Sequence, residues 1–191
     1  MTLFTALTMF LQTAPVVVTD CDRLAAHPSD PDRVTAGVPE SKVDTAAAIP
    51  ACHAAVAADP ANGRLNYQLA RALGYAGRGK EAAPYRQAAV KADYPQALFV
   101  VGYIHLLGLN DAPKDACRAG ELIRRSALKG RHAGLVGFPH WSLQGAFTGC
   151  SVAQDKSEMK GFLEAAKPMS KGDFYQMILI DSIAARLAAA P

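Results

Sequence analysis

The sequence predicts an all-α fold made of an array of helix pairs. Hydrophobic residues make up 50% of the 191 residues and charged residues only 19%. Much of the apolar fraction is alanine, the residue with the highest helix propensity. Glycine and proline divide the chain into stretches of helical length, and the long alternating Val/Ile/Thr runs that favour strands are missing. A chain of this length suits one domain.

The first 43 residues are predicted to hold no long helix. The apolar run within 1–19 is too short to span a bilayer, but it has the length of a signal-peptide core. It lacks a leading Lys or Arg, so a frayed or packed first helix is the alternative interpretation. Residues 20–43 contain turn signals such as Pro28, Pro31 and Gly37, which predict a turn-rich lead-in.

Three helices are predicted after the lead-in. The first covers about 44–59 and has to kink or break at Pro50. The next two cover roughly 63–74 and 80–92. The glycine-containing breaker at 75–79 lies between them, so the two form a helical hairpin.

Small and apolar residues in this hairpin resemble a tetratricopeptide repeat. Leu69 and Ala70 fall on the paired positions of the first helix, and Ala82 and Ala89 fall on the two alanine positions of the second. The closing proline comes one place late, at Pro95. The resemblance implies a right-handed α-α superhelix, or solenoid, in which each helix pair stacks on its neighbours.

The next unit is similar to the Sel-one-like variant of that repeat. Its order of small residues, turn glycine, proline and aspartate is matched by Ala97, Val101, Gly102, Gly108, Pro113, Asp115, Ala119, Leu122, Ser126, Ala127 and Gly130. A degenerate copy follows, and a small pair recurs near Ala88, Ala127 and Ala166 with a period of 39 residues. The predicted array therefore covers 44–172, and 173–191 is expected to be a capping helix over its last apolar face.

The four cysteines favour disulfide bonds over a metal site. Cys21, Cys52, Cys117 and Cys150 form no CxxC motif, and no histidine falls at zinc-ligand spacing with them. Four cysteines allow three connectivities, of which sequential pairing closes two loops of similar size. The geometry of the resembled repeat makes Cys117 and Cys150 neighbours along one edge of the array. Disulfides in turn require an exported chain.

Sequence motifs for catalysis, cofactors and nucleic acids are missing. The net charge of +3 is small and the basic residues are scattered, which argues against nucleic-acid binding. The glycines within 74–79 lack the Lys-Ser/Thr of a phosphate-binding loop. We therefore expect no cofactor and no metal. A hydrolase-like enzyme is the alternative, with Cys150 or Ser142 as nucleophile, His140 as base and Asp155 as orienting group.

The resemblance implies binding of a protein or peptide through the surface of the first helices. Helix register gives the candidate partner-binding residues Asn66, Gln68, Arg71, Phe99, Tyr103 and Leu107. Trp141, the single tryptophan, is either a binding hot spot or a core residue of the degenerate repeat. We therefore expect a non-catalytic scaffold or adaptor that is periplasmic or secreted, with the cytoplasm as the alternative location.

Two further roles fit the same pattern. Related repeats accompany caspase-like domains, which would make this chain the regulatory partner of such a domain. An uncleaved first segment would instead tether the protein to a membrane surface, although the missing basic flank and Pro15 argue against that role.

Overall fold

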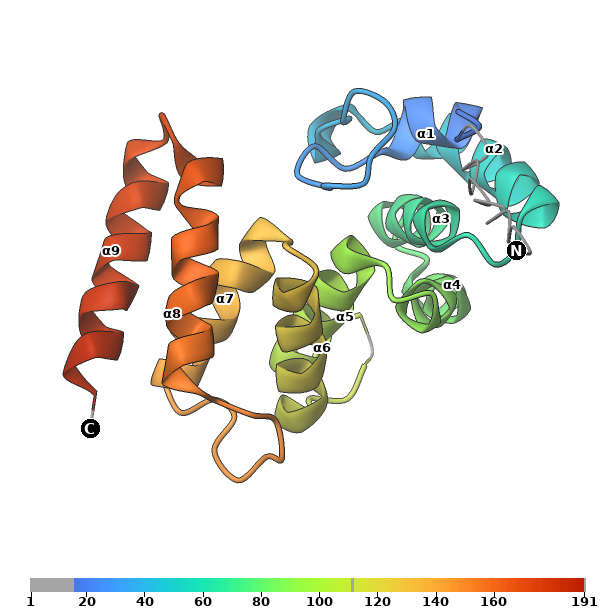
Figure 1. Cartoon of the computed structure of the whole chain (residues 1–191). Coiled ribbons are helices and arrows are strands. Elements are labelled where there is room, and N and C mark those ends of the chain that lie inside the picture. Colours follow the sequence, from blue (N-terminus) through green and yellow to red (C-terminus); the bar gives the residue numbers. More distant parts are fainter. Residues whose placement is uncertain (1–15, 111, 191) are drawn as a thin grey trace, which may run out of the picture.

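The computed structural model describes residues 16–110 and 112–190 (Figure 1). All regular structure in these residues is helical, which confirms the all-α prediction. The α-helices are α1 (Asp20–Ala25), α2 (Thr45–Ala58), α3 (Gly63–Tyr75), α4 (Gly79–Lys91), α5 (Pro95–Leu107), α6 (Ala116–Leu128), α7 (His132–Leu143), α8 (Lys156–Ala166) and α9 (Phe174–Ala189). Two short 3-10 helices, η1 (Glu40–Lys42) and η2 (Pro168–Ser170), lie between them. The predicted signal segment 1–19 lies outside the described residues except for 16–19.

Each helix packs mainly against its neighbours in the sequence. The most extensive contacts join α3 to α4 and α5 to α6, followed by α6 to α7 and α2 to α3. In Figure 1 the helices follow one another from α1 and α2 at one end of the molecule to α8 and α9 at the other. This order is compatible with a helical repeat, because each unit of a repeat contacts only the units beside it.

Short polar side chains fix where several helices begin. Side chains that accept a hydrogen bond from an amide of the first turn are Asp44, Asn62, Asp115, Asp155 and Asp173. These caps satisfy N–H groups that have no partner inside the helix. At its other end α5 stops at Gly108, whose φ of 70° is left-handed and favours glycine.

Two glycines allow close packing of the central helices. A Cβ atom at Gly102 of α5 would lie 2.7 Å from Cγ1 of Ile123 on α6. One at Gly134 of α7 would lie 2.6 Å from the backbone nitrogen of Ala127 on α6. A larger residue at either position would push the helices apart.

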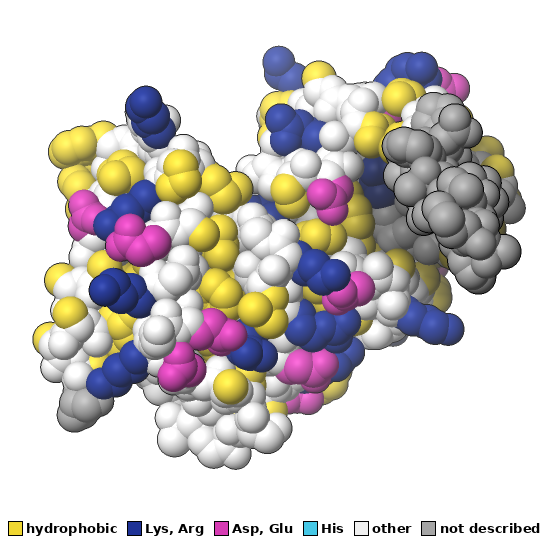
Figure 2. Space-filling view, viewed as in Figure 1, with side chains coloured by type: hydrophobic (Ala, Val, Ile, Leu, Met, Phe, Trp, Pro, Cys, Tyr) yellow, Lys and Arg dark blue, Asp and Glu magenta, His cyan; other side chains and the backbone are white. Residues whose placement is uncertain are grey.

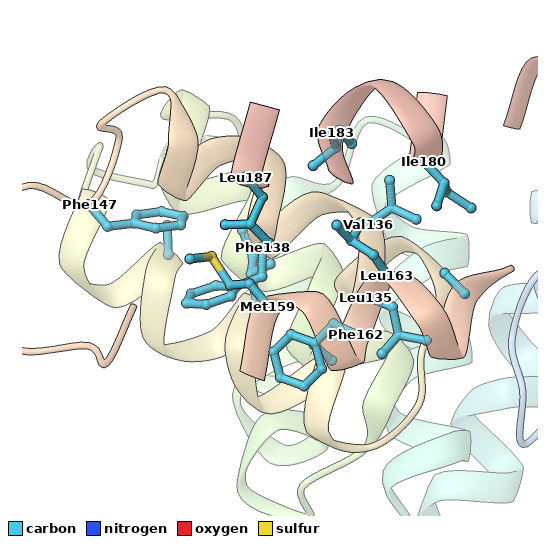
Figure 3. Close-up of a cluster of buried hydrophobic side chains, with 14 of the residues drawn as sticks. Leu135, Val136, Phe138, Phe147, Met159, Phe162, Leu163, Ile180, Ile183 and Leu187 are labelled. Carbon is cyan, nitrogen blue, oxygen red and sulfur yellow. The ribbon is translucent and has the colours of Figure 1, made fainter. Parts of the chain in front are cut away.

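The largest core lies where α7, α8 and α9 meet (Figure 3). Its labelled side chains are Leu135, Val136, Phe138, Phe147, Met159, Phe162, Leu163, Ile180, Ile183 and Leu187. The rings of Phe138 and Phe147 stack with centroids 5.7 Å apart. Through its inward-facing isoleucines and leucine, α9 covers the apolar face that α7 and α8 leave open. It therefore lies where the sequence predicts a terminal helix.

The lead-in contains an α-helix that the sequence analysis missed, α1. The hydroxyl of Thr19 accepts a hydrogen bond from the amide of Asp22, and the Asp22 carboxylate accepts one from the amide of Thr19 at 2.8 Å. This reciprocal capping box starts a helix six residues long. The turn signals that governed the prediction begin only at Pro28, after the helix has ended.

All four cysteines are paired, and the pairing is sequential. Cys21 of α1 is bonded to Cys52 of α2, with a sequence separation of 31. Cys117 at the start of α6 is bonded to Cys150 in the loop between α7 and α8, with a separation of 33. The predicted proximity of Cys117 and Cys150 is confirmed, and the structure selects one of the three possible connectivities.

Candidate partner-binding face

The α3 part of the expected binding face is covered by the N-terminal segment of the same chain. Gln68 is fully buried, and its Nε2 donates a hydrogen bond to the Asp22 carboxylate at 3.0 Å. The same carboxylate forms a buried ion pair with Arg64. Thr19 and these partners together hold the pKa of Asp22 below its usual value, although burial opposes this.

Arg71 binds the lead-in directly. Its guanidinium donates to the carbonyl oxygens of Ala25 at 3.0 Å, Ala26 at 3.2 Å and Val38 at 2.7 Å. Asn66, also buried, donates to the carbonyl oxygen of Pro60 at 2.9 Å. Gln68, Asn66 and Arg71 are thus used in internal contacts that hold the fold together, and they form no open binding face along α3.

The α5 part of the expected face is open and joins an aromatic cluster. We use this name for Phe99, Tyr103 and Trp141, whose ring centroids lie 5.9 to 6.3 Å from one another. Tyr103 is 38% exposed and Leu107, one turn further along α5, is 48% exposed. Trp141 comes from α7 and is partly buried against Phe99, so it contributes to packing and remains in part accessible.

A shallow groove runs between α7 and α9 beside the aromatic cluster. Its volume is about 240 Å³ and its lining is mostly apolar. The lining residues that matter here are Val136, His140 and Trp141 on α7 with Gln176 and Leu179 on α9. An aliphatic or aromatic side chain of a partner fits such a surface, because burial against Trp141 removes apolar area from water.

A larger cleft lies between the lead-in and the beginning of α9. Figure 2 shows it as the notch at the top of the molecule. Its volume is about 460 Å³, with Pro31 and Arg33 on one wall, Met169 and Asp173 on the other, and Arg131 in its lining. The cleft shares residues with the α7–α9 groove, so the two form one continuous surface. The shared lining residues are His132, Ala133 and Gln176.

The charge of the cleft is mainly positive. Arg33 is exposed, and Arg131 is buried with its guanidinium over the ring of Phe99 at 5.5 Å. Nε of Arg131 donates to the side chain of Gln96, which donates in turn to the Tyr67 hydroxyl at 3.2 Å. Burial lowers the pKa of Arg131, yet an arginine keeps its charge at neutral pH. The floor of the cleft therefore carries a fixed, positioned cation.

A buried carboxyl group lies beneath the lead-in wall. Asp30 is fully buried and accepts a hydrogen bond from the Tyr94 hydroxyl at 2.6 Å and from the amide of Asp32 at 3.1 Å. Burial raises the pKa of Asp30 despite these hydrogen bonds. The pair links the lead-in to the start of α5, so the cleft wall has a fixed position.

A third hollow separates α3 from α5. Its volume is about 250 Å³, and His27, Tyr67, Arg71, Tyr75 and Arg86 supply its polar lining. His27 belongs to the lead-in, so this hollow also depends on the N-terminal segment for one of its walls.

The residues of the hydrolase-like alternative are not arranged for nucleophilic catalysis. Cys150 is bonded to Cys117 and offers no thiol in this state. Ser142 Oγ and His140 Nδ1 are buried without a hydrogen-bond partner among the described residues, so no hydroxyl–imidazole pair is formed. Asp155 caps α8 by accepting a hydrogen bond from the amide of Glu158. A nucleophile, its base and an orienting group need mutual hydrogen bonds.

The described part of the chain offers neither a metal-binding cluster nor a membrane-spanning helix. No three His, Cys, Asp or Glu side chains in 16–110 and 112–190 are grouped as metal ligands would be. Within the same ranges, no helix combines the length and the hydropathy needed to cross a bilayer.

Several lining residues of this surface were missed by the sequence analysis. Helix register pointed to α3 and α5, whereas Arg33, Arg131 and Leu179 come from the lead-in, a helix N-terminus and α9. No local signal marks them, because they meet only when the lead-in folds beside the starts of α7 and α9. The one sequence signal for this surface was the single tryptophan, Trp141, which lies in the groove between α7 and α9. No protein-family model, curated protein or solved structure matches the chain.

Proposed function

We propose that the protein is a non-catalytic binding module of the tetratricopeptide or Sel-one-like class that holds a segment of a partner protein. The helix order supports this class, because each pair contacts the next along the chain. The small residues of the sequence pattern lie at close helix contacts, as Gly102 does between α5 and α6. A right-handed superhelix of this type presents its first helices on one side.

The continuous surface of cleft, groove and aromatic cluster carries the proposal. One end is basic through Arg33 and Arg131, and the other is apolar through Trp141 and Leu179. The partner segment is therefore a peptide that combines an acidic group with a large apolar side chain. The acidic group binds in the cleft, and the apolar side chain is buried in the α7–α9 groove.

The two disulfides support an exported location, periplasmic or secreted. Intramolecular disulfides persist in oxidising compartments, and the reducing cytoplasm disfavours them. Mass spectrometry and thiol counting on protein from its native host test this part. We expect loss of an N-terminal segment and no free thiol. An intact N-terminus with four free thiols would place the protein in the cytoplasm.

Binding can be tested with a display library of short random peptides and the oxidised protein. Selected peptides are expected to share a carboxylate and an aromatic or branched aliphatic residue. Synthetic versions should then change the fluorescence of Trp141, which is the single tryptophan and lies in the groove. Titration of that signal gives the Kd of each peptide.

Matched variants decide whether this surface is the binding site. Arg33→Glu reverses a charge of the cleft, and Leu179→Asp places a charge in the apolar groove. Each is expected to weaken binding about tenfold, or by about 1.4 kcal/mol. Lys160→Glu on α8, which lines neither hollow, is the charge-matched control and should bind normally. If the peptides bind both Arg33→Glu and Leu179→Asp as tightly as they bind the wild type, this surface is not the binding site.

A further inference from the structure

The outward face of α9 is an apolar surface separate from the peptide groove. The helix buries Ile180, Ile183 and Leu187 in the core, while Phe174 is 70% exposed and Tyr175 is 82% exposed. One turn further on, Ile178 is 51% exposed. Together they leave roughly several hundred Å² of apolar surface in water, close to the largest patch that ordinary monomers expose.

This face is divided into a half with large side chains and a half with small ones. Phe174, Tyr175 and Ile178 occupy the first turns of α9, whereas Ser182, Ala185 and Ala189 follow on the same side at helical spacing. The three small residues are also exposed. A surface of this kind is complementary to itself when two copies of the helix run in opposite directions.

We propose that two copies of the chain form a two-fold dimer through an antiparallel pair of α9 helices. With the two-fold axis on the exposed face of α9, at the height of Ile180, Tyr175 lies level with Ala185 of the second copy and Ile178 lies level with Ser182. Large side chains then fill the space above small ones, which allows close helix packing. The same pairing occurs twice, because a two-fold interface uses one patch from each copy.

The charges of α9 favour the same direction. Asp173 caps its N-terminus and Arg186 lies in its last turn. Antiparallel pairing about the level of Ile180 brings the end of α9 that carries Arg186 to the level of the end that carries Asp173 in the second copy. Within the described residues Arg186 has no ion pair of its own. The opposed helix dipoles also attract each other in this arrangement, whereas a parallel pair would place like ends together.

The dimer leaves the proposed peptide groove accessible. Phe174, Tyr175 and Ile178 line neither the cleft nor the groove, and Leu179 turns toward α7 instead. The dimer therefore goes beyond the proposed function, and it would give the assembly two peptide sites. Failure of either proposal leaves the other standing, because the residues substituted in the two sets of experiments do not coincide.

Sedimentation velocity on the oxidised full chain tests the dimer. The wild type is expected to change from monomer to dimer as its concentration rises through the micromolar range. Ile178→Glu should raise the dimer Kd at least about tenfold, since it places two charges in the apolar interface. Leu128→Glu is the matched control, because Leu128 is 54% exposed at the end of α6, and it should dimerise normally. A wild type that stays monomeric, or an Ile178→Glu variant that dimerises normally, would overturn the proposal.

Cysteine cross-linking tests the antiparallel register. Ile178→Cys and Ser182→Cys are made in separate chains, mixed and oxidised under mild conditions. The mixture is expected to yield the hetero-linked dimer, because these positions lie opposite each other. Each variant alone should give little cross-linked product. Efficient self-linking of Ile178→Cys would indicate a different register or a parallel pair and would contradict the proposed geometry.

Discussion

His27 is a titratable residue of the lead-in that faces a hollow between helices. Its ring lines the hollow between α3 and α5, and its Nδ1 accepts a hydrogen bond from the amide of Ser29 at 3.0 Å. Burial, followed by the nearby charges of Arg71 and Arg131, lowers the pKa of His27 from 6.5 to about 4. The imidazole is therefore neutral in the folded protein at neutral pH, and it accepts a proton there less readily than in the unfolded chain.

This shift predicts a loss of stability in mild acid. Because the folded pKa lies below the unfolded one, the contribution of His27 is complete above pH 6.5 and is lost as the pH falls toward about 4. Urea denaturation at several pH values should show a steeper loss for the wild type than for His27→Gln. The exposed His53 of α2 provides the control, and His53→Gln should keep the wild-type slope. Identical slopes for wild type and His27→Gln would contradict the assignment.

At the residue scale, the sequence predicted covalent partners better than polar ones. Cysteines are few, and the resembled repeat places the turns that carry Cys117 and Cys150 along one edge of the array, so their proximity could be expected. Gln68 and Arg71 were assigned to a binding face because helix register shows only which way a side chain points. Their partners lie 33 to 46 residues away in a segment whose own sequence signals only turns.

Prolines inside helices are an unusual feature at the scale of the elements. Pro50, Pro84 and Pro139 lie within α2, α4 and α7. The sequence analysis expected a kink or a break at Pro50, and the structure shows α2 as one helix over Thr45–Ala58. Buried side chains before the proline, Ala48 and Ile49, and after it, Cys52 and Val56, hold α2 in the core on both sides. Each internal proline still lacks an N–H donor, which costs helix stability.

Replacing prolines is expected to have opposite effects in a helix and in a loop. Pro84 is exposed within α4, so Pro84→Ala restores a helical hydrogen bond and should raise stability by about 1 to 3 kcal/mol. Pro113 is exposed in the loop before α6, where Pro113→Ala increases the entropy of the unfolded chain and should lower stability by about 0.4 to 1 kcal/mol. Chemical denaturation measures both. A less stable Pro84→Ala variant would mean that α4 needs its proline for packing.

Most elements could be predicted from the sequence because their boundaries carry local signals. The predicted helices at 63–74 and 80–92 agree with α3 and α4 within one residue at each end. The exception, α1, is a helix too short to be stable alone. It is held by the Cys21–Cys52 disulfide and the Asp22–Arg64 ion pair, both of which are long-range contacts. Local patterns report helix propensity, and α1 depends on tertiary structure.

At the scale of the whole molecule, the two disulfides lie in different regions and differ in their exposure to solvent. The Cys21–Cys52 bond is fully buried and fastens α1 to α2. The Cys117–Cys150 bond fastens the start of α6 to the loop before α8, and Cys117 is exposed. Reductants reach exposed disulfides first. Limited reduction of the wild type should therefore open Cys117–Cys150 while Cys21–Cys52 stays intact.

Removing one disulfide at a time tests whether stability is distributed locally along the array. Replacing both cysteines of either pair by alanine releases a loop of similar length, so each double variant should lose roughly 3 to 4 kcal/mol in the chain-entropy estimate. Hydrogen exchange should locate the two losses in different places. Because each helix contacts mainly its neighbours, loss of Cys21–Cys52 is expected to weaken amide protection in α1, the lead-in and α3.

Loss of Cys117–Cys150 is expected to act at the other end of the molecule. It should weaken protection in α6, in α7 and in the loop before α8, while α2 and α3 keep theirs. If each variant loses protection uniformly from α1 to α9, the chain unfolds as one cooperative unit. Protection that changes only near the missing bond would mean instead that the lead-in can separate from α3 while the groove between α7 and α9 stays folded. The N-terminal cover of the array and its peptide-binding surface would then be independent parts of one chain.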